Sequence, residues 1–258
     1  MKNFFLALIT ISLFFYFSNP CFSQDNDSWT EIYKKGEMTV GFCAQYPPFE
    51  SKMKSGKFIG FDVDLGKALA EKMGINVKFT DGEWQGLVAG MGKGDYDILI
   101  SCISKSTARK KNVNFSEPYL DLSEVILVRK DEKDIKELKD LKNKITGVQM
   151  ATSSEKTVDD LPVFFKNVRK YNYTTEAILD LKYKRIDAVV CGYAYAVLQI
   201  RKEPSLIITG KPLRSSEIVM VLPKGADSFT QKINTALEEI KKDGTYKKIY
   251  NKWLAIKN

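Results

Sequence analysis

Residues 61–101, FDVDLGKALAEKMGINVKFTDGEWQGLVAGMGKGDYDILIS, alternate twice between a helical pattern and a strand pattern. The first helical segment places apolar side chains on one face and ends at Gly74, a residue type that often terminates helices. Helices are predicted at 61–73 and 84–91, and strands at 76–79 and 96–101. Such alternation is typical of α/β units whose parallel strands are buried on both faces.

The same alternation extends along the rest of the chain in both directions. Further strands are predicted at 38–42, 125–129, 145–149, 168–171, 187–191 and 218–222, with helices from Ser153, from Thr174 and over 227–253. In an open parallel sheet, ligands bind beyond the carboxyl ends of the strands. Those ends are rich in small hydroxyl, thiol and aromatic residues, and they lie at 43–46, 101–104, 149–152 and 191–193. The spacing therefore predicts a binding site formed by these loops.

The N-terminal segment 1–23 has the layout of a secretory signal peptide. Lys2 precedes an apolar stretch at 4–17, which is too short for a membrane span of about 20 residues. We expect export to the periplasm with cleavage after Ser23. Lipidation of Cys21 is the alternative, and the proline directly before Cys21 disfavours it.

Composition excludes several classes of function. The chain has 40 Lys and Arg against 32 Asp and Glu, but the lysines are scattered and export disfavours a nucleic-acid partner. Histidine is absent, which excludes His-based metal sites and Ser-His or Cys-His catalysis. Cleavage would leave Cys43, Cys102 and Cys191, so at least one thiol has no intramolecular partner.

Several segments, taken in order, resemble the polar amino-acid family of bacterial periplasmic binding proteins, and are similar to its histidine-, glutamine- and cystine-binding members. The matching pieces are 40–50, GFDVDL at 60–65, WQGL at 84–87, GDYDI at 94–98, 104–109, FSEPY at 115–119, 147–149, RIDAV at 185–189 and DGTYKKIYNKW at 243–253. Together they cover nearly the whole chain after the predicted signal peptide.

The resemblance implies a type II periplasmic-binding-protein fold, with two α/β lobes joined by two crossing hinge strands. Lobe 1 is then expected at 24–121 plus 214–258, and lobe 2 at 122–213. Proteins of this family close their lobes around a solute and dock on an inner-membrane ABC permease. We therefore expect a monomer that binds a small carboxylate-bearing solute, in first place an amino acid, without a cofactor or a metal.

Arg109 is the residue predicted to bind the ligand's carboxylate. It follows Ser106, a predicted helix N-cap, and the resemblance places the carboxylate-binding arginine at this position. A guanidinium presents a planar fork that matches the two oxygens of a carboxylate. Ser104 is expected to add a hydroxyl and a backbone N–H to the same group.

Thr152 and Ser153 are expected to approach the carboxylate from lobe 2. They begin a predicted helix, whose free N–H groups and positive dipole end favour an anion; helix capping is their alternative role. By the resemblance, Tyr46 and Trp84 form apolar walls of the pocket, whereas Phe49 is expected in the core beneath.

Two positions depart from the family pattern. The family often has an aspartate for the ligand's α-ammonium where this chain has Gly192, so either another acid replaces it or the ligand has no ammonium. The candidate replacements are Glu217, Asp121 and Glu50. Cys43 occupies a place where binders of basic amino acids have an acid, which argues against a basic ligand. Cys43 and Cys102 are expected to line the pocket as free thiols, with a disulfide as the alternative.

Two other functions compete with solute binding. One is a periplasmic enzyme of the cyclohexadienyl-dehydratase type on the same fold, which needs an acid or base in the cleft. The lack of histidine and of a carboxylate at Gly192 disfavours it. The other is a sensor module, which is disfavoured because no signalling segment follows Trp253.

Overall fold

A computed structural model describes residues 27–108 and 112–255. The predicted signal peptide, Cys21 and Arg109 lie outside these residues. The helices are α1 (Ser28–Lys35), α2 (Phe61–Met73), α3 (Leu87–Gly92), α4 (Lys105–Ala108), α5 (Ser153–Asp160), α6 (Thr174–Lys182), α7 (Tyr193–Lys202), α8 (Asp227–Lys242) and α9 (Thr245–Trp253), with 3₁₀ turns η1 (Trp84–Gly86) and η2 (Leu138–Leu141). The strands are β1 (Glu37–Phe42), β2 (Gln45–Tyr46), β3 (Glu50–Lys52), β4 (Phe58–Ile59), β5 (Asn76–Asp81), β6 (Ile98–Ser104), β7 (Val113–Phe115), β8 (Leu120–Arg129), β9 (Ile145–Gln149), β10 (Asn167–Tyr171), β11 (Ala188–Gly192) and β12 (Leu206–Pro223).

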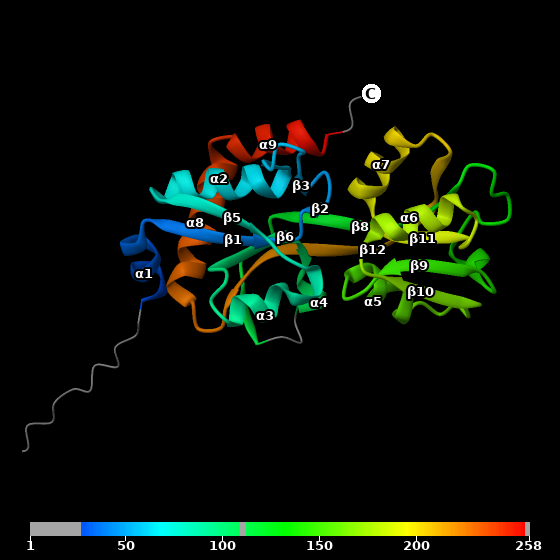
Figure 1. The fold of residues 1–258 in the computed structure, drawn as a ribbon, viewed down its shortest axis with the longest axis horizontal. Coiled ribbons are helices and arrows are strands. Elements are labelled where there is room, and N and C mark those ends of the chain that lie inside the picture. The colour runs from blue at the N-terminus through cyan, green and yellow to red at the C-terminus, as the bar shows by residue number, and fades with distance from the viewer. Residues whose placement is uncertain (1–26, 109–111, 256–258) are drawn as a thin grey trace, which may run out of the picture.

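One mixed sheet runs through the whole molecule in the order β10-β9-β11-β8-β12-β6-β1-β5, with β7 paired to β12 (Figure 1). Strand β1 is parallel to β5 and β6, and β9 is parallel to β10 and β11. The central strands β8 and β12 are antiparallel to each other and to their outer neighbours. The predicted parallel α/β units therefore form two groups, and an antiparallel pair joins them.

The two groups form two lobes, and β8 and β12 run between them (Figure 1). We call the part around β1, β5 and β6 the first lobe and the part around β9, β10 and β11 the second lobe. This arrangement confirms the expected two-lobed α/β architecture with two crossing strands. The predicted lobe limits at 121/122 and 213/214 fall inside β8 and β12, and they stay predictions.

The core of the first lobe lies on both faces of its strands. Along β6, Ile98 and Ile100 pack into the cluster formed with α2 and α8, whereas Leu99 and Ile103 pack on the opposite face with α3. Successive residues of a strand point to opposite faces of the sheet. In a strand whose two faces are both buried, the residues at odd and at even positions must therefore both be apolar. The unbroken apolar run after Asp97 follows from this arrangement.

The second lobe has the same construction. Val125 and Leu127 of β8 pack against α6 and α7, whereas Ile126 and Val128 face the cluster that contains Leu141 of η2. Among the described residues, no helix is long and apolar enough to cross a membrane.

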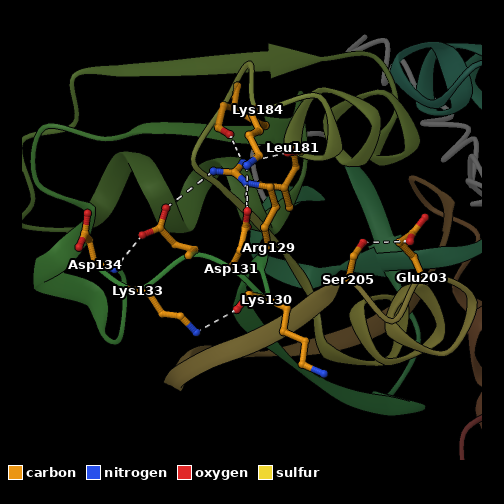
Figure 2. A network of polar contacts seen from close by, with 11 residues as sticks. Arg129, Lys130, Asp131, Lys133, Asp134, Leu181, Lys184, Glu203 and Ser205 are labelled. Carbon is orange, nitrogen blue, oxygen red and sulfur yellow. Dashed lines mark hydrogen bonds and ion pairs between the residues drawn. The ribbon is translucent and has the colours of Figure 1, made fainter.

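Arg129, the last residue of β8, lies in a network of polar contacts in the second lobe (Figure 2). Its Nη1 donates to the carbonyl oxygens of Leu181 at 2.8 Å and Ile186 at 2.7 Å. Asp131 lies 3.7 Å from its Nε, and Glu132 lies 3.7 Å from its Nη2. The guanidinium thus adds a donor to the Leu181 carbonyl at the end of α6, which also accepts from the Lys184 N–H at 3.1 Å.

Most predicted elements are present, but the sequence patterns missed α1, α7, η2 and the short strands β2, β3, β4 and β7, and they found only part of β12. Strand β12 was predicted only at 218–222, and it begins at Leu206. Its middle is polar and irregular, with a register shift between Thr209 and Arg214, so it shows no strand period. Helix α7 was not predicted because it follows β11 directly, without a turn residue to mark its start other than Gly192.

Candidate functional site

A cleft lies between the lobes, at the carboxyl ends of β1, β6 and β9 and against β8. Loops from both lobes line it. The predicted site residues that line it are Cys43, Tyr46, Trp84, Cys102, Ser104, Thr152 and Ser153. Leu122, Glu124, Ser154, Tyr173 and Thr174 also line it, and the sequence patterns had not pointed to them. The strand-end rule therefore located the cleft, although it missed residues contributed by strand β8.

Hydrogen bonds join the two lobes across the cleft. The indole Nε1 of Trp84 in the first lobe donates to the carbonyl oxygens of Met150 at 3.1 Å and Ala151 at 3.2 Å in the second. Gln85 Nε2 donates to Asn172 Oδ1 at 3.1 Å. The lobes are therefore in direct contact. Trp84 lines the cleft and also joins the lobes, and we call its two hydrogen bonds to the second lobe the Trp84 latch.

Tyr46 stacks between two aromatic rings. Its ring centroid lies 5.7 Å from that of Phe49 and 4.7 Å from that of Tyr195, with interplanar angles of 12° and 4°. Phe49 is fully buried, which confirms its predicted place in the core. Tyr195 belongs to α7, so Tyr46 is a cleft wall and an inter-lobe contact at once.

Cys43 and Cys102 both line the cleft, and both are free thiols. Burial raises the pKa of Cys43 to about 12 and that of Cys102 well above its usual range. Protonated thiols are weak nucleophiles and weak metal ligands. At neutral pH these two thiols are therefore small, unreactive parts of the cleft lining. Within the part of the chain that the structure covers, no His, Cys, Asp or Glu cluster is arranged to hold a metal ion.

Two buried carboxyl groups lie beneath the first-lobe wall. Glu50 Oε1 accepts a hydrogen bond from Ser101 Oγ at 2.7 Å. Asp62 Oδ2 accepts from the backbone N–H of Cys102 at 2.7 Å and from the Tyr119 hydroxyl at 3.1 Å. Asp62 thus connects strand β6 at Cys102 to the first turn of α2. The second oxygen of each acid, Glu50 Oε2 and Asp62 Oδ1, is buried without a hydrogen-bond partner among the described residues.

Burial raises the pKa values of both acids. Burial, followed by repulsion from Asp62, raises the pKa of Glu50 well above its usual range. Burial also raises the pKa of Asp62, to about 6. Glu50 lines the cleft as one of the predicted replacement acids, but its burial beside Asp62 favours its protonated form.

The other two predicted replacement acids lie away from the cleft. Glu217 is half-exposed and pairs with Lys105 at 3.4 Å. Asp121 is exposed and lines a separate groove together with Tyr193. Neither residue can meet a ligand held in the cleft, so both candidates were wrong.

Glu124 is the acid that the sequence patterns missed. It lies on β8, lines the cleft and is only 1% exposed. Its Oε1 accepts from Ser153 Oγ at 2.5 Å, and its Oε2 accepts from Ser154 Oγ at 2.6 Å. Burial raises its pKa. A buried acid beside an apolar strand is rare, and the glutamate directly before the run 125–129 was the available signal.

Gly192 lies beside this acid rather than in the wall. It pairs with Glu124 in the β11–β8 ladder, and it is buried. A Cβ atom added to Gly192 would lie 2.7 Å from Leu122 Cδ2 and 2.9 Å from the Tyr46 hydroxyl. The aspartate common at this place in the family would therefore displace two residues of the wall.

The hydroxyls of Thr152 and Ser104 are engaged within the protein. Thr152 caps α5, since its Oγ1 donates to the Gln149 carbonyl at 2.7 Å and accepts from the Glu155 N–H at 3.2 Å. Ser104 Oγ lies 2.7 Å from Ser106 Oγ. Helix α4 begins at Lys105, so the prediction that Ser106 precedes the helix as its cap was wrong.

Comparisons with known proteins agree along nearly the whole chain. The model of the family described as bacterial extracellular solute-binding proteins, family 3, matches residues 38–256. The L-cystine-binding protein TcyJ of Escherichia coli (strain K12) is 31% identical over 231 residues, which cover 89% of this chain and 86% of that protein.

Two solved structures show the same fold. An ancestral arginine-binding protein bound to arginine has a TM-score of 0.78 and 39% identity, covering 85% of this chain and 99% of its own. An ancestral amino acid-binding protein described as a precursor of cyclohexadienyl dehydratase has a TM-score of 0.81 and 33% identity, covering 89% of this chain and 100% of its own.

The Glu50–Asp62 pair predicts a pH dependence of stability. The unfolded chain loses the Glu50 proton above its ordinary pKa of 4.5, whereas the folded protein keeps it. The free energy of unfolding should then fall with rising pH, by up to about 1.4 kcal/mol per pH unit for this group. Glu50→Gln, which has no proton to lose in this range, should remove that contribution. Urea denaturation from pH 5 to 8 measures it, with Glu217→Gln as the exposed control, and parallel profiles for wild type and Glu50→Gln would contradict the raised pKa of Glu50.

The Trp84 latch predicts a shift between lobe arrangements. Trp84→Phe retains an aromatic wall but removes the N–H, and one hydrogen bond contributes about 0.5–1.5 kcal/mol. The ligand-free population with the lobes in contact should fall about 2- to 12-fold relative to the separated one. Distances between spin labels on exposed Lys93 and Lys166 measure this population. Trp253→Phe is the control, because its indole donates to Asp64 at 2.8 Å within the first lobe. Identical distance distributions for both variants would contradict the latch.

Proposed function

The chain belongs to family 3 of the bacterial extracellular solute-binding proteins, and from this premise we propose that it captures an amino acid and delivers it to an ABC importer. The observation that supports this most directly is the cleft between two lobes, closed by hydrogen bonds from Trp84 to the opposite lobe. Relatives named for cystine and arginine binding support amino acids as the ligand class.

The ligand's carboxylate is assigned to the first lobe in this proposal. Strand β6 ends at Ser104, which lines the cleft, and Arg109 follows the short helix α4. A guanidinium at this end supplies the positive charge that the carboxylate needs, and a desolvated pair is stronger than one in water. The amides in the first turn of α5, after Thr152, approach from the second lobe and have no partner within their own helix.

The ligand's side chain is assigned to the wall formed by Tyr46, Trp84 and Cys43. The Cys43 thiol is neutral because burial raises its pKa to about 12. A wall of two aromatic rings and a neutral thiol gives a cationic side chain no counter-charge, which costs free energy when water is removed. We therefore propose a ligand whose side chain is uncharged.

Binding, rather than catalysis, is the proposed activity. The observation that bears on the enzyme alternative is Glu124, a buried acid of the kind a dehydratase needs for proton transfer. Both of its oxygens accept hydrogen bonds from serine hydroxyls. This arrangement suits a hydrogen-bond acceptor rather than a group that donates a proton. The related ancestral structure is itself described as an amino acid-binding protein.

Export completes the proposal. The apolar segment at 4–17 and the breaker after it support a cleaved signal peptide, and the family is named for extracellular proteins. We propose a periplasmic monomer that begins near Gln24 and meets its permease at the inner membrane. A lipid anchor at Cys21 is the alternative form.

A thermal-shift screen of L-amino acids and small organic acids tests the function. An amino acid with an uncharged side chain should stabilise the protein most, by about 2.7 kcal/mol at 100 times its dissociation constant. For a protein of this size that corresponds to a rise in Tm of roughly 5–11 °C. No shift with any amino acid would contradict the proposal, and aromatic product from prephenate or arogenate would support the enzyme alternative instead.

Arg109→Ala should abolish useful binding of the amino acid found in the screen. Removing one partner of a desolvated charge pair typically lowers affinity on the order of 30-fold to several thousand-fold. The Tm without ligand should stay near that of wild type, because the role is in binding. Lys110→Ala removes a neighbouring charge and should change affinity less than about 2-fold. Calorimetric titration measures both, and an affinity within about 3-fold of wild type for Arg109→Ala would remove it from the site.

A further inference from the structure

The charges of the cleft are unbalanced in its second-lobe half. Of the described residues that line the cleft, two are acids, Glu50 and Glu124, and none is a lysine or an arginine. Glu50 accepts from Ser101 on the first-lobe side of the cleft, next to the second acid Asp62. On the second-lobe side Glu124 is the acid, and no lysine or arginine among the described lining residues balances its charge.

We propose that Glu124 binds the ligand's α-ammonium group, so that this chain recognises an amino acid with an acid on β8 instead of the aspartate common at the place of Gly192. This inference rests on the proposed function. It assigns the class of ligand as a zwitterion that spans the cleft, with its carboxylate at the first lobe and its ammonium at the second.

The strand register brings Glu124 to the end of the cleft where Gly192 lies. Strands β8 and β11 are neighbours in the sheet (Figure 1). Glu124 pairs directly with Gly192 in their ladder. Side chains of directly opposed residues in an antiparallel pair lie on the same face. Leu122 and Tyr46 fill the space beside Gly192, so an acid fits on β8 and not on β11.

The carboxylate of Glu124 is oriented and still has capacity for an ammonium. A carboxylate offers about four lone-pair sites, and the hydroxyls of Ser153 and Ser154 occupy one on each oxygen. Both hydroxyls act as donors, which favours the ionised form of the acid. The remaining sites suit an ammonium, which has three donors.

The protein itself supplies no close cation for this acid among the described residues. Arg214 lies opposite Glu124 on β12, but its guanidinium donates to Asp160 at 2.9 Å and is partly exposed. Burial raises the pKa of Glu124, and the more distant Arg214 lowers it only as the weakest influence. A ligand ammonium would provide the missing charge and hold the acid in its ionised form.

The test compares amino acids with analogues that lack only the α-amino group. The pairs are L-glutamine with glutaramic acid, L-cystine with 3,3′-dithiodipropionic acid, and L-arginine with 5-guanidinopentanoic acid. Wild type should bind the preferred amino acid at least about 30-fold more tightly than its analogue. Glu124→Gln should lower affinity for the amino acid by on the order of 30-fold to several thousand-fold and leave the analogue unchanged or tighter.

A control and a second variant keep the result interpretable. Asp121→Asn removes one negative charge from the same strand outside the cleft, and it should leave the preference for the amino acid intact. Glu124→Asp retains the charge and should keep more of that preference than Glu124→Gln does, which a merely structural role would not require.

Three outcomes overturn the inference. A wild type that binds the analogue as tightly as the amino acid shows that no ammonium is recognised, while solute binding stands. A Glu124→Gln variant that keeps the wild-type preference, or loses both compounds equally, shows that Glu124 does not contact the ammonium. A wild type that binds none of the amino acids and none of the analogues overturns the proposed function as well.

Discussion

The pairing of β8 with β12 is the constraint on which the rest of the structure depends. These two strands turn two separate parallel sheets into one continuous sheet, and they are the antiparallel step at its centre. Each lobe buries its own core on both sides of its strands, and Tyr46 packs against both cores. The register shift between Thr209 and Arg214 places the irregular part of the pair where the lobes meet. The sheet is therefore continuous between the lobes, although its pairing is irregular at that point.

The same pair determines what the cleft contains. Because β8 passes directly behind the cleft, alternate residues of it, Leu122 and Glu124, become part of the wall. Parallel strands contribute only their ends and the loops that follow them. The cleft thus has residues such as Trp84, which belong to one lobe, and residues such as Glu124, which belong to a strand that connects the two lobes.

The sequence predicted much of this arrangement for a physical reason. Strands covered on both faces are continuous apolar runs, and α2 ends at Gly74 with positive φ of 71°, so both signals are local. The residues at Cys43, Ser104 and Thr152 were found because strand ends converge by topology. Glu124 was missed because its place in the cleft depends on which strand lies beside β11. The order of strands in a sheet cannot be predicted from the local pattern of apolar residues. Glu217 was chosen wrongly for the same reason.

A buried acid on strand β8 can make closure depend on the ligand. When the lobes meet with the cleft empty, Glu124 loses water and gains only two serine hydroxyls, and its raised pKa records that desolvation. Under the role proposed for it, an ammonium would offset this loss only in the closed form, while the Trp84 latch favours contact with or without a ligand. A ligand shifts such an equilibrium by its differential affinity for the two forms. The hydrogen bonds of Trp84 would then favour contact between the lobes, and the desolvation of Glu124 would oppose it. An amino acid, which has an ammonium, would therefore shift the equilibrium toward contact more than a plain carboxylate would.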